Sequence, residues 1–167
     1  MNIHLREITA DTVRAVCDLV AEPSGYVAPN AVSMAQAHCH PEAWVRAVYL
    51  GDEPVGFVML EDSSMLATPP PKLEVSLWRF MIDTKHKRKG YGHMELRQVI
   101  DDVRRRHPAL AILSTSCVPG ADSPRPFYES LGFVASGEVD NGEEVLTLQL
   151  HAQAQPDEQS QVGGVTR

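Results

Sequence analysis

The sequence is constrained most by one segment, in which an apolar run, a basic turn and an amphipathic helix follow one another directly. Leu73–Ile82 is mostly apolar, as in a buried strand, Asp83–Lys89 is charged, and Gly90–Gly92 leads into the helix. The helix is indicated by a stripe of apolar residues at helical spacing: Leu96, Val99, Ile100 and Val103. Glycine lets the backbone come close to an anion, and the first amides of a helix have no acceptor within it. The segment therefore predicts a strand–turn–helix unit that binds phosphate.

The charge of the turn supports this interpretation. Lys85, Lys87, Arg88 and Lys89 gather there, although the whole chain has a formal net charge of −7. The turn is not a P-loop, since no Gly-Lys-Ser/Thr follows. It is not a dinucleotide fingerprint either, since its two glycines have no third glycine at the required spacing. Taken alone, the pattern is also compatible with a helix start that carries a solvated basic face.

Patterns along the rest of the chain predict a mixed α/β domain. Further strands are expected near Ile3–Ile8, Trp44–Leu50, Val55–Leu60, Leu110–Ser116, Phe133–Val139 and Glu143–Leu150. Further helices are expected around Val13–Val20, Ala31–His38 and Ser123–Leu131. The element order is then βααβββαβαββ, which makes 1–151 one domain. Residues 152–167 are rich in Gln and Gly and are expected to form a disordered tail.

Composition narrows the class of function. A net charge of −7 disfavours nucleic acid and anionic membranes, and the basic turn has no interleaved aromatic residue beyond Tyr91. No apolar run reaches the roughly 20 residues of a membrane span, and Met1–Glu7 lacks the apolar stretch of a secretory signal. Cys17, Cys39 and Cys117 are widely spaced and suit a reducing compartment. We therefore expect a cytoplasmic protein that binds neither nucleic acid nor membranes.

Two other patterns contain reactive or metal-binding residue types but do not predict a site. His38-Cys39-His40 is a run of adjacent residues with no second cluster at zinc-like spacing, so no metal site is predicted. Cys117 follows a strand but has no evident His/Asp partner set for nucleophilic catalysis.

Two motifs together resemble the signatures of the GNAT superfamily of N-acetyltransferases. Leu77–Asp83 with Lys87–Gly92 is similar to the first signature, a strand followed by Gln/Arg-x-x-Gly-x-Gly/Ala, with Lys87 at the Gln/Arg position. Phe127–Phe133 is similar to the second, aromatic-Tyr-x-x-x-Gly-Phe. The resemblance spans residues 1–150, because the order of elements matches as well. It implies a mostly antiparallel central sheet flanked by helices, with a V-shaped opening between the fourth and fifth strands.

The resemblance implies that acetyl-CoA is the acyl donor and binds in this opening. The backbone of Phe80, Met81 and Ile82 would pair with its pantetheine arm as an added strand. The amides of one loop would bind its pyrophosphate, with His93 nearby at the helix start. The residues of this loop are Lys87, Arg88, Lys89, Gly90, Tyr91 and Gly92. These are the amides that the helix N-terminus leaves free, so the two lines of reasoning agree.

The same resemblance assigns roles in the reaction. Tyr128 matches the family's general acid, which protonates the departing sulfur, although a core tyrosine is the alternative. The amide of Met81 would donate to the developing oxyanion. Glu74 is the best-placed candidate for the base and Glu42 a second, while bulk water could also accept the proton of the amine. Many members hold the coenzyme with an Asn in the loop before the tyrosine. Residues 119–126 have none, so Ser123 or Arg125 would have to substitute.

The acceptor is predicted to be a small primary amine. Arg79–Asp83 before a basic Gly-x-Gly turn, together with Gly137-Glu138 and Gly142-Glu143, resembles bacterial diamine and spermine/spermidine acetyltransferases. This favours a polyamine such as spermidine. An aminoglycoside, an amino acid and a protein N-terminus are alternatives within the enzyme class, and a non-catalytic acyl-CoA sensor is an alternative outside it. A homodimer is compatible with the sequence but is not fixed by it.

Overall fold

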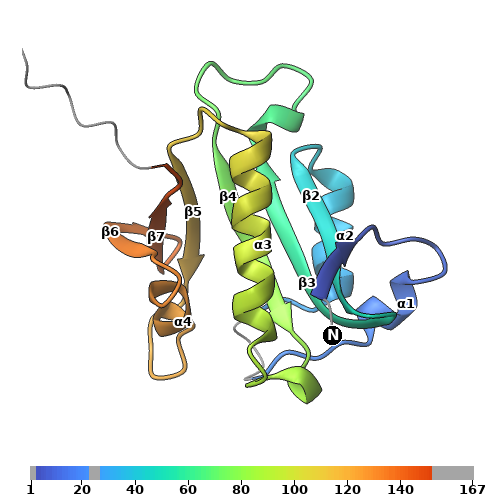
Figure 1. The fold of residues 1–167 in the computed structure, drawn as a ribbon. Helices are drawn as coiled ribbons and strands as arrows, with labels where there is room; N and C mark the ends of the chain where they lie inside the picture. Colours follow the sequence, from blue (N-terminus) through green and yellow to red (C-terminus); the bar gives the residue numbers. More distant parts are fainter. Residues whose placement is uncertain (1–2, 23–26, 152–167) are drawn as a thin grey trace, which may run out of the picture.

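The computed structural model describes residues 3–22 and 27–151, which form one sheet with helices on both faces (Figure 1). The expected tail, 152–167, lies outside the described residues. The elements are β1 (Ile3–Arg6), α1 (Val13–Cys17), α2 (Asn30–Cys39), β2 (Ala43–Leu50), β3 (Glu53–Asp62), β4 (Val75–Ile82), α3 (Tyr91–Arg106), β5 (Ile112–Cys117), α4 (Arg125–Glu129), β6 (Val134–Asp140) and β7 (Glu143–Gln149), with short 3₁₀ helices η1 (Ser63–Met65) and η2 (Thr84–His86). The predicted order of helices and strands is confirmed.

The sheet has the order β1-β2-β3-β4-β5-β7-β6, and only β4 and β5 run parallel. These two strands pair at Ser76 with Ser114 and at Leu77 with Thr115, whereas β4 pairs with β3 as far as Ile82. Beyond Leu77, β4 therefore has an edge toward β5 that no strand of the described chain occupies. Figure 1 shows the two strands diverging from this point. The expected V-shaped opening is present.

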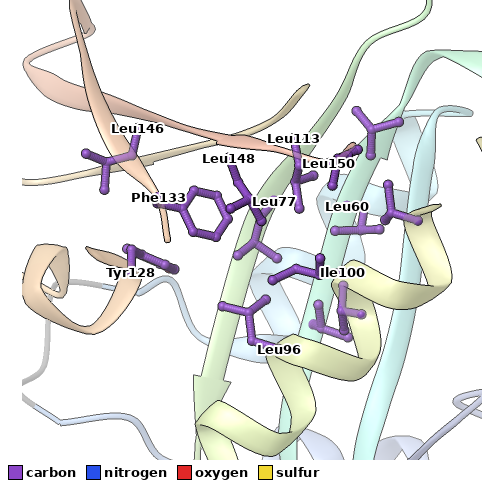
Figure 2. Close-up of a cluster of buried hydrophobic side chains, with 14 of the residues drawn as sticks. Leu60, Leu77, Leu96, Ile100, Leu113, Tyr128, Phe133, Leu146, Leu148 and Leu150 are labelled. Carbon is purple, nitrogen blue, oxygen red and sulfur yellow. The ribbon is translucent and has the colours of Figure 1, made fainter. Parts of the chain in front are cut away.

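The main core lies on one face of the sheet, between the strands and the two helices α3 and α4 (Figure 2). The predicted stripe of α3 is buried in it, and Leu96, Val99 and Val103 have no exposed surface. Burying one such side chain contributes on the order of 1.5–3 kcal/mol. Because several apolar side chains of α3 are buried in this way, the N-terminus of the helix is held in a fixed position beside the end of β4.

The opposite face of the sheet is covered by α1 and α2. A second cluster forms there from Val16, Ala47, Tyr49, Phe57, Met59 and Met81. α1 ends at Cys17, before the Val20 that the sequence pattern predicted, because the backbone of Val20 is engaged elsewhere. Its amide donates to the Asp83 carboxylate at 2.9 Å, and its carbonyl accepts from the Thr84 amide at 2.9 Å. The loop after α1 thus holds the turn that follows β4.

None of the helices in the described ranges has the length and apolar character that a membrane crossing requires.

Candidate active site

The turn between β4 and α3 leaves a row of backbone amides without acceptors. Gly90 is the N-cap of α3 with φ 82°, and Arg88 also has a positive φ, 61°. The first hydrogen bond into the helix runs from the Met94 amide to the Gly90 carbonyl at 3.2 Å. Within the described part of the chain, no hydrogen bond uses the amides of residues 88–93. Such an array at the positive end of a helix is suited to an anion.

The side chains of this turn add positive charge. Lys85, Lys87, Arg88 and Lys89 are all exposed, and none of them takes part in an ion pair with another described residue. Anionic side chains elsewhere therefore do not neutralise them. A ligand with several phosphate charges would find both amides and cations here.

Helix α4 is packed onto the start of α3. The Phe127 ring lies 3.5 Å from the position that a Cβ on Gly92 would take. The rings of His93 and Phe127 are in edge-to-face contact, with their centroids 5.0 Å apart. A hydrogen bond of 2.7 Å joins the His93 ring to the Ser130 hydroxyl, which in turn donates to the Phe127 carbonyl at 2.5 Å. The second sequence motif is thereby brought against the first, although they are far apart along the chain.

Tyr128 lies inside this junction with only 7% of its surface exposed. Its ring meets those of Phe127 and Phe133 in edge contacts at 5.4 and 5.6 Å, at the margin of the core shown in Figure 2. Burial raises the pKa of Tyr128 to about 12, although the Thr115 hydroxyl that faces it acts in the opposite direction. The phenol therefore keeps its proton at neutral pH.

Thr115 connects this tyrosine to the point where the strands diverge. Its buried hydroxyl donates to the Leu77 carbonyl at 3.1 Å, across the last paired position of β4 and β5. Tyr128 therefore lies at the apex of the V-shaped opening. The phosphate-binding turn lies at the open end, where β4 leads into α3.

Two charged residues at the opening were not predicted as site residues. Arg79 lies on β4 just past the apex, and burial lowers the pKa of Arg79 while the negative charge of Glu143 partly restores it. The Glu143 carboxylate, at the start of β7, accepts a hydrogen bond from Ser116 on β5. The negative charge of Glu143 also contributes to the raised pKa of Tyr128. The only sequence signals were the charge of Arg79 within an apolar strand and the hairpin that precedes Glu143.

Some of the residues predicted for the site lie at the V-shaped opening, and others do not. Phe80, Met81 and Ile82 lie in the part of β4 with the free edge, and the turn residues lie at its end. Glu74 is exposed and precedes β4, at the opposite end of the strand from the opening.

The backbone of Glu42 lies at the same end of the sheet as Glu74, since the Glu42 carbonyl accepts from the amide of Asp62, which pairs with Val75. The Glu42 carboxylate faces the His40 ring at 3.2 Å, and that ring meets Trp78 of β4 with a centroid distance of 5.1 Å. The Ser123 hydroxyl accepts from the Arg125 amide at 3.3 Å and so stabilises the start of α4. Arg125 itself is held by Glu129 and Glu144.

The His38-Cys39-His40 run does not gather further ligands. Among the residues that the structure describes, no group of three or more His, Cys, Asp or Glu side chains could hold a metal ion.

Comparison with known proteins agrees with this architecture. A model of the acetyltransferase (GNAT) family matches residues 13–133. A search of curated proteins finds no significant match. Among solved structures, a protein from Desulfovibrio desulfuricans assigned to the GNAT family of acetyltransferases superposes with a TM-score of 0.68 at 18% identity, covering 90% of this chain and 100% of that one.

Two further solved structures share the fold. The PaiA N-acetyltransferase from Thermoplasma acidophilum, in complex with coenzyme A, has a TM-score of 0.64 at 11% identity, covering 89% of this chain and 99% of that one. The ribosomal-protein-S18-alanine N-acetyltransferase from Escherichia coli has a TM-score of 0.64 at 14% identity, covering 95% and 99%. At these identities the structures show a shared fold. The family model covers most of the chain, from α1 to the end of the second motif, so the protein belongs to the GNAT family and is an acyl-CoA N-acyltransferase.

Proposed function

We propose that the protein transfers the acetyl group of acetyl-CoA to a primary amine by direct attack in a ternary complex at the V-shaped opening. The observation that carries this proposal is the position of Tyr128. A buried phenol that keeps its proton lies at the apex of the opening, facing Thr115 at the last paired position of β4 and β5.

The residues of the opening fit acetyl-CoA, a substrate that supplies an activated acetyl thioester. The pantetheine arm carries amide groups, and the free edge of β4 at Phe80, Met81 and Ile82 offers backbone partners to them, as in strand addition. Met81, the predicted amide donor to the carbonyl oxygen, lies within this stretch. The pyrophosphate would be bound by the free amides of residues 88–93, up to His93, and by the side-chain cations of Lys87, Arg88 and Lys89. Ser123, whose hydroxyl accepts from the amide at the start of α4, is proposed as a further contact to the coenzyme.

The chemistry requires proton transfer at two places. The amine must be neutral to attack, so that the C–N bond forms as the C–S bond breaks, and the leaving sulfur must gain a proton. Tyr128 holds a proton at neutral pH and is the proposed donor to the sulfur. Glu74, the predicted base, stays a proposal, but its exposed position at the far end of β4 favours bulk water as the acceptor of the amine's proton.

The acceptor is the less determined substrate. The resemblance around Arg79–Asp83 makes a small polyamine such as spermidine the first candidate, with an aminoglycoside, an amino acid and a protein N-terminus as the others. The E. coli neighbour acts on an alanine of ribosomal protein S18, which keeps the protein N-terminus among the candidates. We also retain the cytoplasm as the proposed compartment and a homodimer as a proposed assembly.

The test is a thiol-release assay with acetyl-CoA and a panel of polyamines, amino acids, aminoglycosides and peptides. We expect coenzyme A to be released only when a suitable amine is present, with the reaction lacking an amine as the control for hydrolysis. Tight coenzyme binding without turnover on any amine would contradict the enzyme proposal and favour an acyl-CoA sensor.

A further inference from the structure

A β-bulge in β4 brings two successive side chains to the same face of the sheet. The pairing of β3 with β4 shifts between Met59 and Leu60, which oppose Arg79 and Leu77, so Trp78 has no partner on β3. Bulges of this kind re-aim side chains and are common beside active sites. Trp78 packs into the cluster on the α1/α2 face, and the Arg79 guanidinium lies over its ring, 5.5 Å from the centroid.

The Arg79 guanidinium is poorly satisfied for a half-buried cation. It donates one hydrogen bond, from Nη1 to the Trp78 carbonyl at 2.9 Å. Its Nε is buried and has no hydrogen-bond partner in the described parts of the chain, and Arg79 forms none of the ion pairs found there. A buried donor left unpaired costs free energy, and a guanidinium presents its donors in a fork that matches a carboxylate.

A negative charge lies on the other arm of the opening, close enough to counteract part of the lowering of the Arg79 pKa. The Glu143 carboxylate is positioned by a hydrogen bond from Ser116 of β5. Its negative charge acts to raise the pKa of both Arg79 and Tyr128. Arg79 and Glu143 nevertheless do not approach within the 4.0 Å of an ion pair. The opening therefore carries a cation, Arg79, on β4 and an anion, Glu143, on β7, and the two do not form an ion pair with each other.

This arrangement discriminates between classes of amine. A polyamine carries only positive charges, so Arg79 would repel it while Glu143 attracts it. An amino acid carries a carboxylate one carbon away from its ammonium group and would satisfy both side chains at once. The Trp78 ring, flanked by His40, supplies an apolar surface beside Arg79.

We infer that the acceptor is a zwitterion with a carboxylate beside its primary amine, such as an amino acid, whose carboxylate binds Arg79 and whose ammonium group pairs with Glu143. This inference rests on the proposed acetyl transfer and names its substrate class. Arg79 is the residue that determines specificity. It selects the carboxylate through the donors that the fold leaves unpaired.

The test compares acceptors that differ only in the carboxylate: ornithine with putrescine, lysine with cadaverine, and phenylalanine with phenethylamine. The wild-type enzyme should acetylate at least one of these amino acids with a higher kcat/KM than the matched amine. Arg79→Met should raise the KM for the amino acid by roughly ten- to a hundredfold, the effect of losing a hydrogen bond to a charged group, whereas the KM for the matched amine should not rise, because the cation that is removed repels it.

Arg46→Met is the matched control. Arg46 also lies over a tryptophan, Trp44, at 4.7 Å, and also donates to the carbonyl of the residue before it, but it lies on β2, away from the opening. This variant should keep the wild-type preference. A wild-type preference for putrescine or cadaverine, or an equal effect of Arg79→Met on amino acid and amine, would overturn the inference.

A binding measurement separates this inference from the proposed function. Calorimetric titration of the same acceptors into the protein with coenzyme A needs no turnover. An amino acid that binds the wild type and not Arg79→Met supports the zwitterion site even if acetyl transfer fails. Binding of none of the amino acids to the wild type refutes it, whether or not other amines are acetylated.

Discussion

Phe80 of β4 and Phe127 of α4 stack with their ring planes 7° from parallel and their centroids 5.9 Å apart. The stack links the two motifs that identified the family, on the face of the sheet that α3 covers. Because Phe127 also contacts His93 and lies beside Gly92, one ring orders the phosphate-binding turn, the free edge of β4 and the helix that carries Tyr128.

Replacing Phe127 with leucine should therefore weaken both the fold and the donor site. We expect Phe127→Leu to lower the free energy of unfolding by about 1–2 kcal/mol, since it removes three ring contacts, with Phe80, His93 and Tyr128, while keeping an apolar side chain. The KM for acetyl-CoA should rise because the start of α3 is less ordered. Urea unfolding and initial rates measure the two effects. Met94→Leu, at an exposed neighbouring position, is the control. Unchanged stability would show that the stack does not hold α4 in place.

The role of Tyr128 can be separated from coenzyme binding. Tyr128→Phe keeps the buried ring but removes the proton of the phenol, so kcat should fall by about 10²–10⁴-fold, the usual contribution of a general acid. The Kd for coenzyme A should stay unchanged by calorimetry. Since burial raises the pKa of Tyr128 to about 12, the wild-type rate should show no loss from deprotonation of this group between pH 7 and pH 9, a range that lies roughly 3 units or more below that value. Tyr49→Phe on β2 serves as the control. Undiminished turnover in Tyr128→Phe would remove this residue from the mechanism.

Gly92 allows stability to be changed without a change in coenzyme binding. A Cβ at this position would meet the Phe127 ring at 3.5 Å, an ordinary contact, and alanine suits a helix better than glycine by up to about 1 kcal/mol. Gly92→Ala should therefore unfold at an equal or higher urea concentration. Its affinity for coenzyme A should stay that of the wild type, because the added methyl group points at Phe127 and Ile82, and because the motif that Gly92 matches takes either glycine or alanine at this position.

The control for this experiment is Arg97→Ala, an exposed change on the same helix. It should leave coenzyme affinity unaltered. If Gly92→Ala bound coenzyme A more weakly than the wild type, the added methyl group would have to lie against the phosphates and not against Phe127.

The order of elements and the phosphate-binding turn could be predicted because they depend on local patterns. The apolar spacing of α3 and the two glycines before it are short-range signals, and each acts through the backbone of its own segment. Boundaries were predicted less well where a distant contact decides them. α1 stops at Cys17 because Asp83 and Thr84, from the turn after β4, bind the backbone of Val20.

The charged residues of the opening could not be predicted for a related reason. The bulge at Trp78 results from the register between β3 and β4, and an apolar strand does not reveal in its own sequence where that register shifts. Glu143 reaches the site through the pairing of β7 with β5, far from Arg79 in sequence. Glu74 directly precedes β4, but the opening lies at the other end of that strand.

Glu95 on α3 makes a prediction about stability that is independent of catalysis. Its side chain has no exposed surface, and neither carboxyl oxygen has a hydrogen-bond partner among the described residues. Burial alone raises the pKa of Glu95 from 4.5 to about 7. In the unfolded chain the group ionises near its ordinary pKa, so the unfolded state loses its proton first. The free energy of unfolding should therefore fall as the pH rises from about 4.5 to about 7, and level off above that.

Glu95→Gln removes the ionisation while nearly preserving the shape. Since one pKa unit corresponds to about 1.4 kcal/mol, the variant should be more stable than the wild type by about 3 kcal/mol at pH 8 and by little at pH 5. Urea unfolding across this range measures the difference, with Glu138→Gln, at an exposed position, as the control. If wild type and Glu95→Gln differed by the same amount at pH 5 and pH 8, the carboxyl would have to be hydrated or paired in the folded protein. If the predicted slope is found, the core of this enzyme carries an ionisable group that makes it less stable above neutral pH, on the same helix whose first turn is proposed to bind the coenzyme.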